Sequence, residues 1–426
     1  MKKLTALLLA TAMVVSLAAC GNSAASTATD TAEATVEETT DAAAEVTEAV
    51  AEAAGEGKVV KAGFICLHDE NSTYDLNFIN AAKEACENMG IDYLIKTNIP
   101  EGQECQEAAE ELADEGCNFI FADSFGHEGF LMEAAKEFPE IEFCHATGTQ
   151  AHTAGLANFH NAFAAIYEGR YLAGIAAGLK LNEMIDAGEI TADQAKIGYI
   201  GAYTYAEVIS GYTSFFLGAR SVCPSATMEV TFTGSWYDET AEKEGANKLI
   251  GDGCVLISQH ADSMGAPTAC ETAGVPNVSY NGSTASVAPN TFIVSSRINW
   301  VPYFEYAMGC VKDGKAIDTD WTGTIATGSV ALTELGSAAA EGTQAAIDEA
   351  TAAFSAGTLK VFDTKTFTVD GAEVTTYMAD VDTDEAYEGD HEVIVDGYFD
   401  ESGAAFRSAP YFDLKIDGIT LLDTAF

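Results

Sequence analysis

Hydrophobic residues recur along the chain in two alternating patterns. Short continuous apolar runs, among them residues 59–67, 117–124, 141–148 and 196–203, have the length and composition of buried strands. Between such runs lie segments like residues 78–90, where apolar residues recur at helical spacing until a glycine or proline stops them. Strands that alternate with helices of this kind predict βαβ units and parallel sheets covered on both faces.

The length of the chain divides this pattern into two lobes. At 426 residues the chain is longer than a single hydrophobic core usually supports. We therefore expect an α/β protein with two Rossmann-like lobes joined by a hinge. The first lobe is expected to take residues 58–163 and about 298–326. The second is expected to take about 164–297 and 327–426, with a C-terminal appendage packed on it.

The N-terminus has the pattern of an export signal. Lys2 and Lys3 precede an apolar run that is too short to span a bilayer comfortably. The run ends in Leu-Ala-Ala-Cys at residues 17–20, which resembles the bacterial lipobox. An ordinary secretory signal with an incidental cysteine is the alternative. We expect residues 1–19 to be a lipoprotein signal peptide and Cys20 to be lipidated.

An acidic segment follows the lipobox. Residues 20–57 are rich in alanine, threonine and glutamate and contain no lysine, arginine or aromatic residue. Such a composition buries too little apolar surface to fold, so it predicts a flexible tether. A tether from a lipidated cysteine places the folded body at the cell membrane, on its extracytoplasmic face.

The composition excludes some partners. The formal net charge is -46, from 66 acidic and 20 basic residues. A surface of this charge repels phosphates, so we expect no nucleic acid partner. Nine cysteines lie beyond Cys20, with no CxxC pair and no zinc-ligand spacing, and several lie within apolar runs. They are interpreted as buried structural thiols, although a disulfide in an exported protein stays possible.

Polar segments follow most of the predicted strands. Ligands bind beyond the carboxyl ends of strands in parallel α/β sheets, so these segments are the candidate site. Many of them place an aromatic residue beside a hydroxyl, amide or carboxylate, which suits a flat, hydrogen-bonding ligand better than an ion. No phosphate-binding loop, GxSxG or HExxH motif is present. Ser124, His145 and Asp262 could be assembled into a hydrolase triad, but we expect no catalytic residue, metal or cofactor.

Four of these segments, residues 121–149, 164–178, 206–238 and 256–263, together resemble the basic membrane protein family. Its members are substrate-binding lipoproteins of ABC importers. The resemblance extends over residues 58 to about 426. It implies the type I periplasmic-binding fold and a non-enzymatic role. It also implies a purine nucleoside or nucleobase as ligand, and ABC permease and ATPase subunits as partners.

The strand-end positions that match the family supply the predicted ligand contacts. These are Asn71, Ser72, Thr73, Tyr74, Ser124, Phe125, Trp236, Asp262, Asn281 and Trp300. Each also has a structural alternative. Tyr74 can stack on a base or pack on its own lobe, and residues 71–73 can cap the following helix. Asp262 can cap a helix, Asn281 can form an Asn-Gly turn, and one of the two tryptophans can be structural.

The opening loop differs from that of many relatives. Residues 68–75 lack the glycine-rich segment bearing phenylalanine or tryptophan that many family members have there. The sequence therefore leaves nucleoside and free base undecided. Another flat heterocycle such as a flavin, or a sugar, is the alternative ligand. A ligand-sensing ectodomain and a hydrolase of the same ligands are the alternative functions.

Overall fold

The computed structural model describes residues 57–381, 391–401 and 407–425. The predicted signal peptide, lipidation site and tether lie outside these residues, apart from Gly57 at the end of the tether. Residues Lys58–Phe426 form one compact unit. Across the described ranges, no helix combines the length and the apolar character needed to cross a bilayer.

The first sheet is entirely parallel. Its strand order is β11-β5-β4-β3-β1-β2. The strands are β1 (Lys61–Ile65), β2 (Asp92–Lys96), β3 (Phe119–Ala122), β4 (Glu142–Ala146), β5 (Phe159–Ala164) and β11 (Asp320–Gly323). All residues of β3 and β5 are buried. Burial on both faces explains why β3 reads as a continuous apolar run in the sequence, whereas β5 also buries His160 and Asn161.

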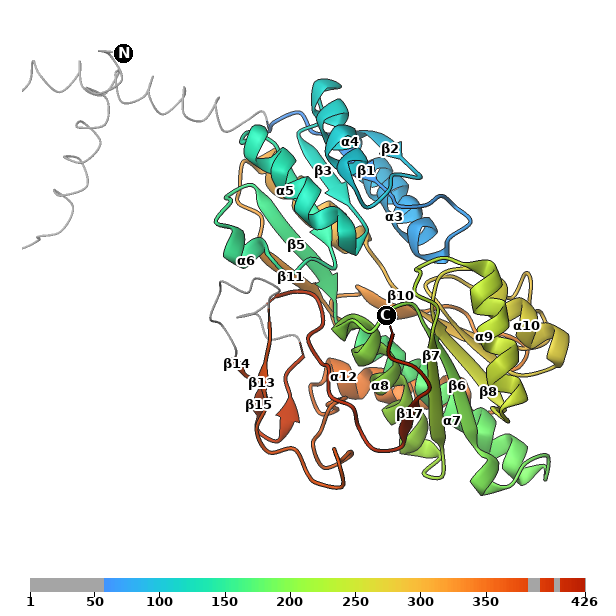
Figure 1. Cartoon of the computed structure of the whole chain (residues 1–426). Coiled ribbons are helices and arrows are strands. Elements are labelled where there is room, and N and C mark those ends of the chain that lie inside the picture. The colour runs from blue at the N-terminus through green and yellow to red at the C-terminus, as the bar shows by residue number, and fades with distance from the viewer. Residues whose placement is uncertain (1–56, 382–390, 402–406, 426) are drawn as a thin grey trace, which may run out of the picture. The chain divides into compact units, whose positions relative to one another are not determined.

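The second sheet has the order β12-β10-β9-β8-β6-β7-β17. Its strands are β6 (Lys196–Gly201), β7 (Thr227–Phe232), β8 (Leu256–His260), β9 (Asn277–Tyr280), β10 (Phe292–Ile298), β12 (Val330–Leu332) and β17 (Ile419–Leu421). Only the pairing of β10 with β12 is antiparallel among these strands. Strand β17 pairs with β7 (Figure 1), so the C-terminal segment completes the sheet.

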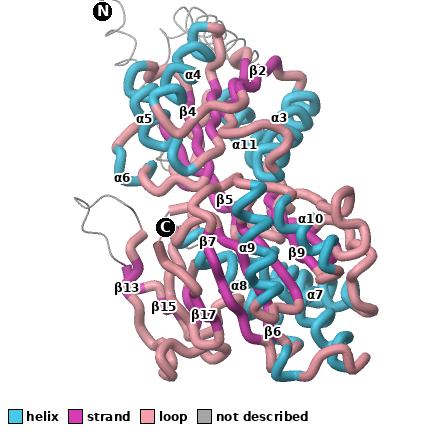
Figure 2. Tube along the Cα trace, turned by 45° about the vertical axis from the view of Figure 1, so that its right-hand side comes forward, coloured by secondary structure: helices cyan, strands magenta, loops and turns pink. Residues whose placement is uncertain are grey.

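Helices cover both faces of the sheets. They are α3 (Thr73–Met89), α4 (Gln103–Asp114), α5 (Glu128–Glu137), α6 (Ala151–Ala154), α7 (Ile166–Asp186), α8 (Ala206–Val222), α9 (Glu239–Gly251), α10 (Gly265–Ala273), α11 (Val301–Asp313) and α12 (Thr343–Ser355). On the second sheet, Tyr199 packs in the core formed with α7 and α8, whereas Ile200 packs with α9 and α10. Figure 2 shows these four helices beside the strands of this sheet. The predicted α/β architecture with covered parallel sheets is confirmed.

The chain passes three times between the two sheets. Strand β5 leads into α7, which packs on α8 and on β10 of the second sheet. Strand β10 leads into α11, which packs on α3 beside the first sheet. Strand β11 of the first sheet is followed by β12 of the second. Two short ladders, β13 (Met378–Ala379) with β14 (His391–Glu392) and β15 (Ile394–Val395) with β16 (Tyr398–Phe399), follow α12.

The nine cysteines beyond Cys20 are all buried and carry no disulfide. They belong to the cores, as Cys86 does beside Met308 and Cys270 does on the buried side of α10. They therefore behave as small apolar side chains, in agreement with the interpretation as structural thiols.

Candidate functional site

A cavity lies at the carboxyl ends of strands from both sheets, and its empty space of about 360 Å³ includes open solvent. Its wall comes from the ends of β8 and β9, from the first turns of α3 and α8, and from the segments after β1, β3, β4, β7 and β8. The lining residues are Leu67, His68, Tyr74, Asp75, Ser124, Phe125, Thr147, Glu207, Trp236, His260, Asp262 and Tyr280.

The first-sheet wall is built around the N-terminus of α3. Ser72 has extended backbone angles and caps the helix, because its Oγ accepts from the backbone N–H of Asp75. The Asp75 carboxylate accepts from Ser72 Oγ at 2.6 Å and from the backbone N–H of His68 at 2.7 Å. Burial alone would raise the pKa of Asp75, but the hydrogen bonds from His68 and Ser72 lower it overall. A carboxylate is thus fixed on the cavity wall.

Tyr74 lies in the first turn of α3, two residues after the cap residue Ser72, and it also lines the cavity. Its hydroxyl donates to the backbone oxygen of Asp123 at 2.7 Å, and its ring meets Phe78 edge-on with centroids 4.8 Å apart. Burial raises the pKa of the phenol well above its usual range, so the hydroxyl remains a donor. The tyrosine packs on its own lobe and lines the cavity, so its two predicted roles are compatible.

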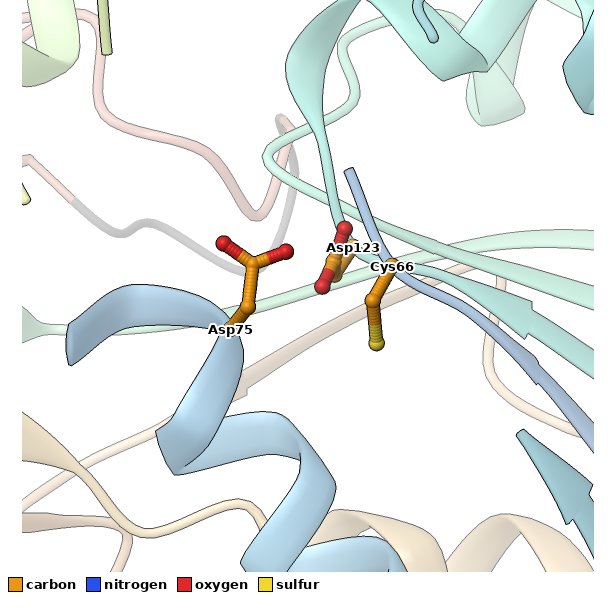
Figure 3. A group of neighbouring side chains, drawn as sticks. All are labelled: Cys66, Asp75 and Asp123. Carbon is orange, nitrogen blue, oxygen red and sulfur yellow. The ribbon is translucent and has the colours of Figure 1, made fainter. Parts of the chain in front are cut away.

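A buried group of Cys66, Asp75 and Asp123 lies behind this wall (Figure 3). One sulfur or carboxylate oxygen from each residue lies within 4.8 Å of the others. Desolvation and then the charge of Asp75 raise the pKa of Asp123 well above its usual range. Burial and then the charge of Asp123 raise the pKa of the Cys66 thiol in the same way. Metal binding requires deprotonated ligands. The group therefore fits a proton-sharing network that supports the wall better than a metal centre.

The second-sheet wall contains a buried histidine–carboxylate pair. His260 Nε2 and Glu207 Oε1 are 3.3 Å apart. Burial and then the charge of Arg170 lower the pKa of His260 to about 4, so the ring is neutral at pH 7 and Nε2 donates to Glu207. The guanidinium carbon of Arg170 lies 3.4 Å from the ring centroid of Tyr280. Arg170 therefore supports Tyr280 from behind the wall.

Asp262 connects the two lobes. Its backbone oxygen accepts from the backbone N–H of Thr73 at 3.1 Å and from Thr73 Oγ at 3.3 Å. Its side chain lines the cavity, where desolvation and then the carboxyl of Glu242 raise its pKa well above the usual range. The alternative of a helix cap is wrong, because the N-cap of α10 is Met264, and Ser263 Oγ accepts from the backbone N–H of Gly265 at 3.0 Å.

Aromatic rings from both lobes meet at the edge of the cavity. Phe125, in the 3-10 turn η2 (Phe125–His127) after β3, stacks on Tyr205 with centroids 4.9 Å apart. Tyr205 comes from the loop after β6 and also stacks on Tyr203, and Trp236 packs against both tyrosines. Tyr205 is 40% exposed, so this contact lies between the cavity and solvent.

The stack predicts a measurable coupling between Phe125 and Tyr205. Each single alanine variant should lose the same ring contact, so the double variant should cost less than the sum of the two single variants. We expect a coupling of about 1 kcal/mol in the free energy of unfolding, within the range for aromatic pairs. A double-mutant cycle by urea denaturation measures it. Additive effects would show that the rings do not interact in solution.

Half of the ten predicted contact residues line the cavity. These are Tyr74, Ser124, Phe125, Trp236 and Asp262. The other five have different positions. Asn71 bonds to the carboxylate of Asp69, Ser72 caps α3, and Thr73 makes the interlobe bonds to Asp262.

Asn281 and Trp300 also lie away from the cavity wall. Asn281 has a left-handed backbone with φ of 62°, as the Asn-Gly turn requires, and lines a separate depression that also includes Thr73. Trp300 is 1% exposed and stacks on Phe78 with centroids 4.5 Å apart. Of the two predicted tryptophans, Trp236 lines the cavity and Trp300 belongs to the core.

Seven lining residues were not predicted individually. They are Leu67, His68, Asp75, Thr147, Glu207, His260 and Tyr280. All of them lie in or beside polar segments at predicted strand ends, so the position was predictable and the side chain was not. Arg170 was missed for another reason, because it lies in a helix whose neighbours are mostly small and apolar. A single arginine among small apolar residues was the only sign in the sequence that this helix contributes a buried charge near the site.

The hypothetical triad of Ser124, His145 and Asp262 is not assembled. Ser124 Oγ donates to Glu101 at 2.6 Å, and His145 Nε2 faces the backbone oxygen of Ser124 instead of its hydroxyl. Asp262 lies across the cavity on the second-sheet side. A nucleophile–base–acid relay is therefore not formed by these three residues.

The fold resembles that of solved solute-binding proteins. An ABC transporter solute-binding protein from Aeropyrum pernix has a TM-score of 0.60 at 16% identity, with 71% of this chain and 93% of that chain covered. One from Conexibacter woesei has a TM-score of 0.58 at 18% identity, with 71% of this chain and 98% of that chain covered. The predicted periplasmic-binding fold is confirmed.

Sequence comparison identifies relatives and a family. A purine-binding protein of Brucella abortus is 32% identical over 260 residues, or 60% of this chain and 69% of that protein. A protein of Haloferax volcanii named as an ABC transporter glucose-binding protein is 29% identical over 286 residues, or 66% of this chain and 68% of that protein. Residues 64–356 match the family described as ABC transporter substrate-binding protein PnrA-like, which confirms the resemblance. The chain belongs to this Bmp family of ABC transporter substrate-binding proteins.

Proposed function

We propose that the protein captures a purine base or purine nucleoside between its two lobes and delivers it to an ABC permease. The observation that carries this proposal is the composition of the cavity. Aromatic rings from Tyr74, Phe125, Trp236 and Tyr280 line the same cavity as hydrogen-bonding side chains. Stacking on a ring contributes about 1–3 kcal/mol per base, and carboxyl oxygens accept from ring N–H and exocyclic amine groups. The name of the Brucella relative supports the same ligand class.

The proposal includes the anchor and the lobes predicted from the sequence. A lipid on Cys20 and the tether of residues 20–57 would hold the body at the extracytoplasmic face of the cell membrane. The first lobe comprises residues 58–163 and about 298–326, and the second comprises about 164–297 and 327–426. Three passages between the sheets support a hinge, because few segments then need to bend when the lobes open and close. A Cys20→Ser protein should leave the membrane fraction.

A ligand panel tests the proposal directly. Purine bases and nucleosides should raise the thermal stability of the full chain in a concentration-dependent manner, and flavins and sugars should not. A ligand at 100 times its Kd stabilises the folded state by about 2.7 kcal/mol. Differential scanning fluorimetry with adenine, guanine, hypoxanthine and their nucleosides measures the effect.

Two tryptophan variants show whether the purine occupies this cavity. Trp236→Ala removes a ring that lines the cavity, so it should weaken purine binding about 10-fold or more. Trp321→Ala removes a ring that stacks on Tyr306 outside the cavity, and it should leave the affinity unchanged. Equal effects of the two variants would place the ligand elsewhere.

A sugar is the second candidate ligand. The Haloferax relative is named for glucose binding, and its identity to this chain is close to that of the Brucella protein. Carboxylates beside an aromatic ring also suit the hydroxyls and apolar face of a sugar. Stabilisation by glucose, without any response to purines, would establish this alternative and reject the purine proposal.

A further inference from the structure

The acidic side chains on the cavity wall bear on which charge a ligand can carry. Among the described residues that line the cavity, three are acidic and none is lysine or arginine. The acidic residues are Asp75 from the first lobe and Glu207 and Asp262 from the second. A ligand between the lobes therefore meets carboxyl groups on both sides.

The two histidines on the wall do not offset this charge. His68 Nδ1 lies 3.4 Å from Asp75 Oδ2, and His260 Nε2 lies 3.3 Å from Glu207 Oε1. Each imidazole therefore faces a carboxylate, so a proton on either ring would compensate that partner and leave no net positive charge for a ligand.

The nearest arginine lies behind the wall. Arg170 is 0% exposed, donates from Nη1 to the backbone oxygen of Gln259 at 2.9 Å, and packs over Tyr280. Its Nε and Nη2 have no hydrogen-bond partner within the described part of the chain, but the side chain does not line the cavity. The layer behind the wall is itself partly acidic, since Asp123 lies beside Asp75 and Glu242 influences Asp262.

The site already holds more acidic groups than it can keep ionised. Burial and the neighbouring carboxyls raise the pKa of both Asp123 and Asp262 well above the usual range. An added anion would meet the same low dielectric and the same repulsion, and no lysine or arginine lines the cavity to pair with it directly. Neutral N–H and O–H donors, in contrast, find acceptors on both sides of the cavity.

We infer that Asp75, Glu207 and Asp262 restrict the ligand to uncharged, donor-rich molecules and exclude phosphorylated ones. This inference rests on the proposed function and assigns the discrimination against nucleotides to these three carboxyls. Nucleotides outside the cell must then be hydrolysed before capture. In that reaction, water attacks phosphorus, the ester P–O bond breaks, the nucleoside oxygen gains a proton and inorganic phosphate is released.

Calorimetric titration of the unmodified full chain tests the inference without a variant. Adenosine, guanosine and inosine are compared with AMP, GMP and IMP at 150 mM NaCl. We expect each nucleotide to bind at least 100-fold more weakly than its nucleoside. Treatment of the nucleotide with a phosphatase should restore the nucleoside signal. A nucleotide that binds within 3-fold of its nucleoside would overturn the inference.

Variants then assign the effect to the named carboxyls. Glu207→Gln and Asp262→Asn should narrow the ratio of nucleotide to nucleoside dissociation constants at least 3-fold. Glu140→Gln removes a carboxyl at an exposed position outside the cavity, and should leave the ratio unchanged. An equal change in all three variants would point to the net charge of the protein and overturn the assignment.

Failure of the proposed function gives a different result. If no purine binds and glucose does, the purine proposal is rejected. The charge rule is then tested with glucose and glucose 6-phosphate on the same protein. The rule survives if the phosphate ester binds at least 100-fold more weakly, and fails if the two bind alike.

Discussion

Replacing Gly174 with alanine is expected to lower the free energy of unfolding by about 3 kcal/mol or more. Gly174 lies in α7, where this helix crosses α8. A Cβ at this position would lie 2.0 Å from the backbone oxygen of Phe215 and 2.9 Å from the backbone nitrogen of Ala219. Neither backbone atom can rotate away, so the two helices would have to separate. Overpacking of a core typically costs about 1–3 kcal/mol, and contact with backbone places this variant at or beyond the upper end.

The same crossing positions part of the cavity wall. Gly218 of α8 is equally close to the backbone oxygen of Tyr171, at 2.1 Å from a hypothetical Cβ, so glycines on both helices allow the approach. Helix α7 carries Arg170 and the first turn of α8 carries Glu207. Separation of the helices would therefore displace these two side chains relative to one another. Ligand affinity should fall together with stability.

A second glycine supplies the control for this prediction. Gly309 lies in α11, and no atom lies within 4 Å of a Cβ built on it. Gly309→Ala should therefore raise the free energy of unfolding by about 0.5–1 kcal/mol through helix propensity alone. Urea denaturation of the two variants measures the difference. A Gly174→Ala protein as stable as the parent would contradict the close approach of α7 and α8.

The fold was predictable because local patterns and global topology agree. A strand such as β3 is buried on both faces, so it appears in the sequence as an uninterrupted apolar run. The order of strands within each sheet was not predictable, because parallel pairing joins segments that are distant in sequence. Strand β17 shows this limit, since pairing with β7 makes it part of the second sheet. Its sequence alone indicated only an appendage.

The candidate site was predictable by segment and less so by side chain. Strand-end position identified the loops that carry Trp236 and Asp262. The direction of each side chain depends on hydrogen bonds and packing that become visible only in three dimensions. Asp75 lines the cavity because Ser72 and His68 bind its carboxylate, whereas Trp300 packs in the core against Phe78. No property of either residue alone distinguishes these outcomes.

Replacing Glu242 with glutamine is expected to remove a large pH dependence of stability. Glu242 is buried behind Asp262 and accepts from the backbone N–H groups of Asp238 and Ser263. Burial raises its pKa from an ordinary 4.5 to about 7, although the bonds from Ser263 oppose the change. A rise of this size corresponds to about 3 kcal/mol, at 1.36 kcal/mol per pKa unit.

The sign of the effect follows from proton binding in the two states. Between pH 4.5 and about 7 the folded protein holds a proton on Glu242 that the unfolded chain releases, so stability falls as pH rises through this window. Glutamine cannot ionise and avoids this loss, while its amide oxygen still accepts from the backbone. Asp123 contributes in the same direction, but it is present in both proteins and cancels in the comparison. Asp262 also contributes in the same direction, and its contribution should be smaller in the variant, because Glu242 is one cause of the raised pKa of Asp262.

Urea denaturation at pH 5 and pH 8 measures the difference between the Glu242→Gln protein and its parent. The free energy of unfolding of the variant, relative to the parent, should be about 2–3 kcal/mol more favourable at pH 8 than at pH 5. Glu140→Gln, at an exposed position, should show no such change, because an exposed carboxyl experiences similar surroundings in the folded and unfolded chain. If the difference in free energy of unfolding between variant and parent is the same at both pH values, Glu242 is ionised in the folded protein at both. The prediction that burial keeps this carboxyl protonated behind Asp262 would then be wrong.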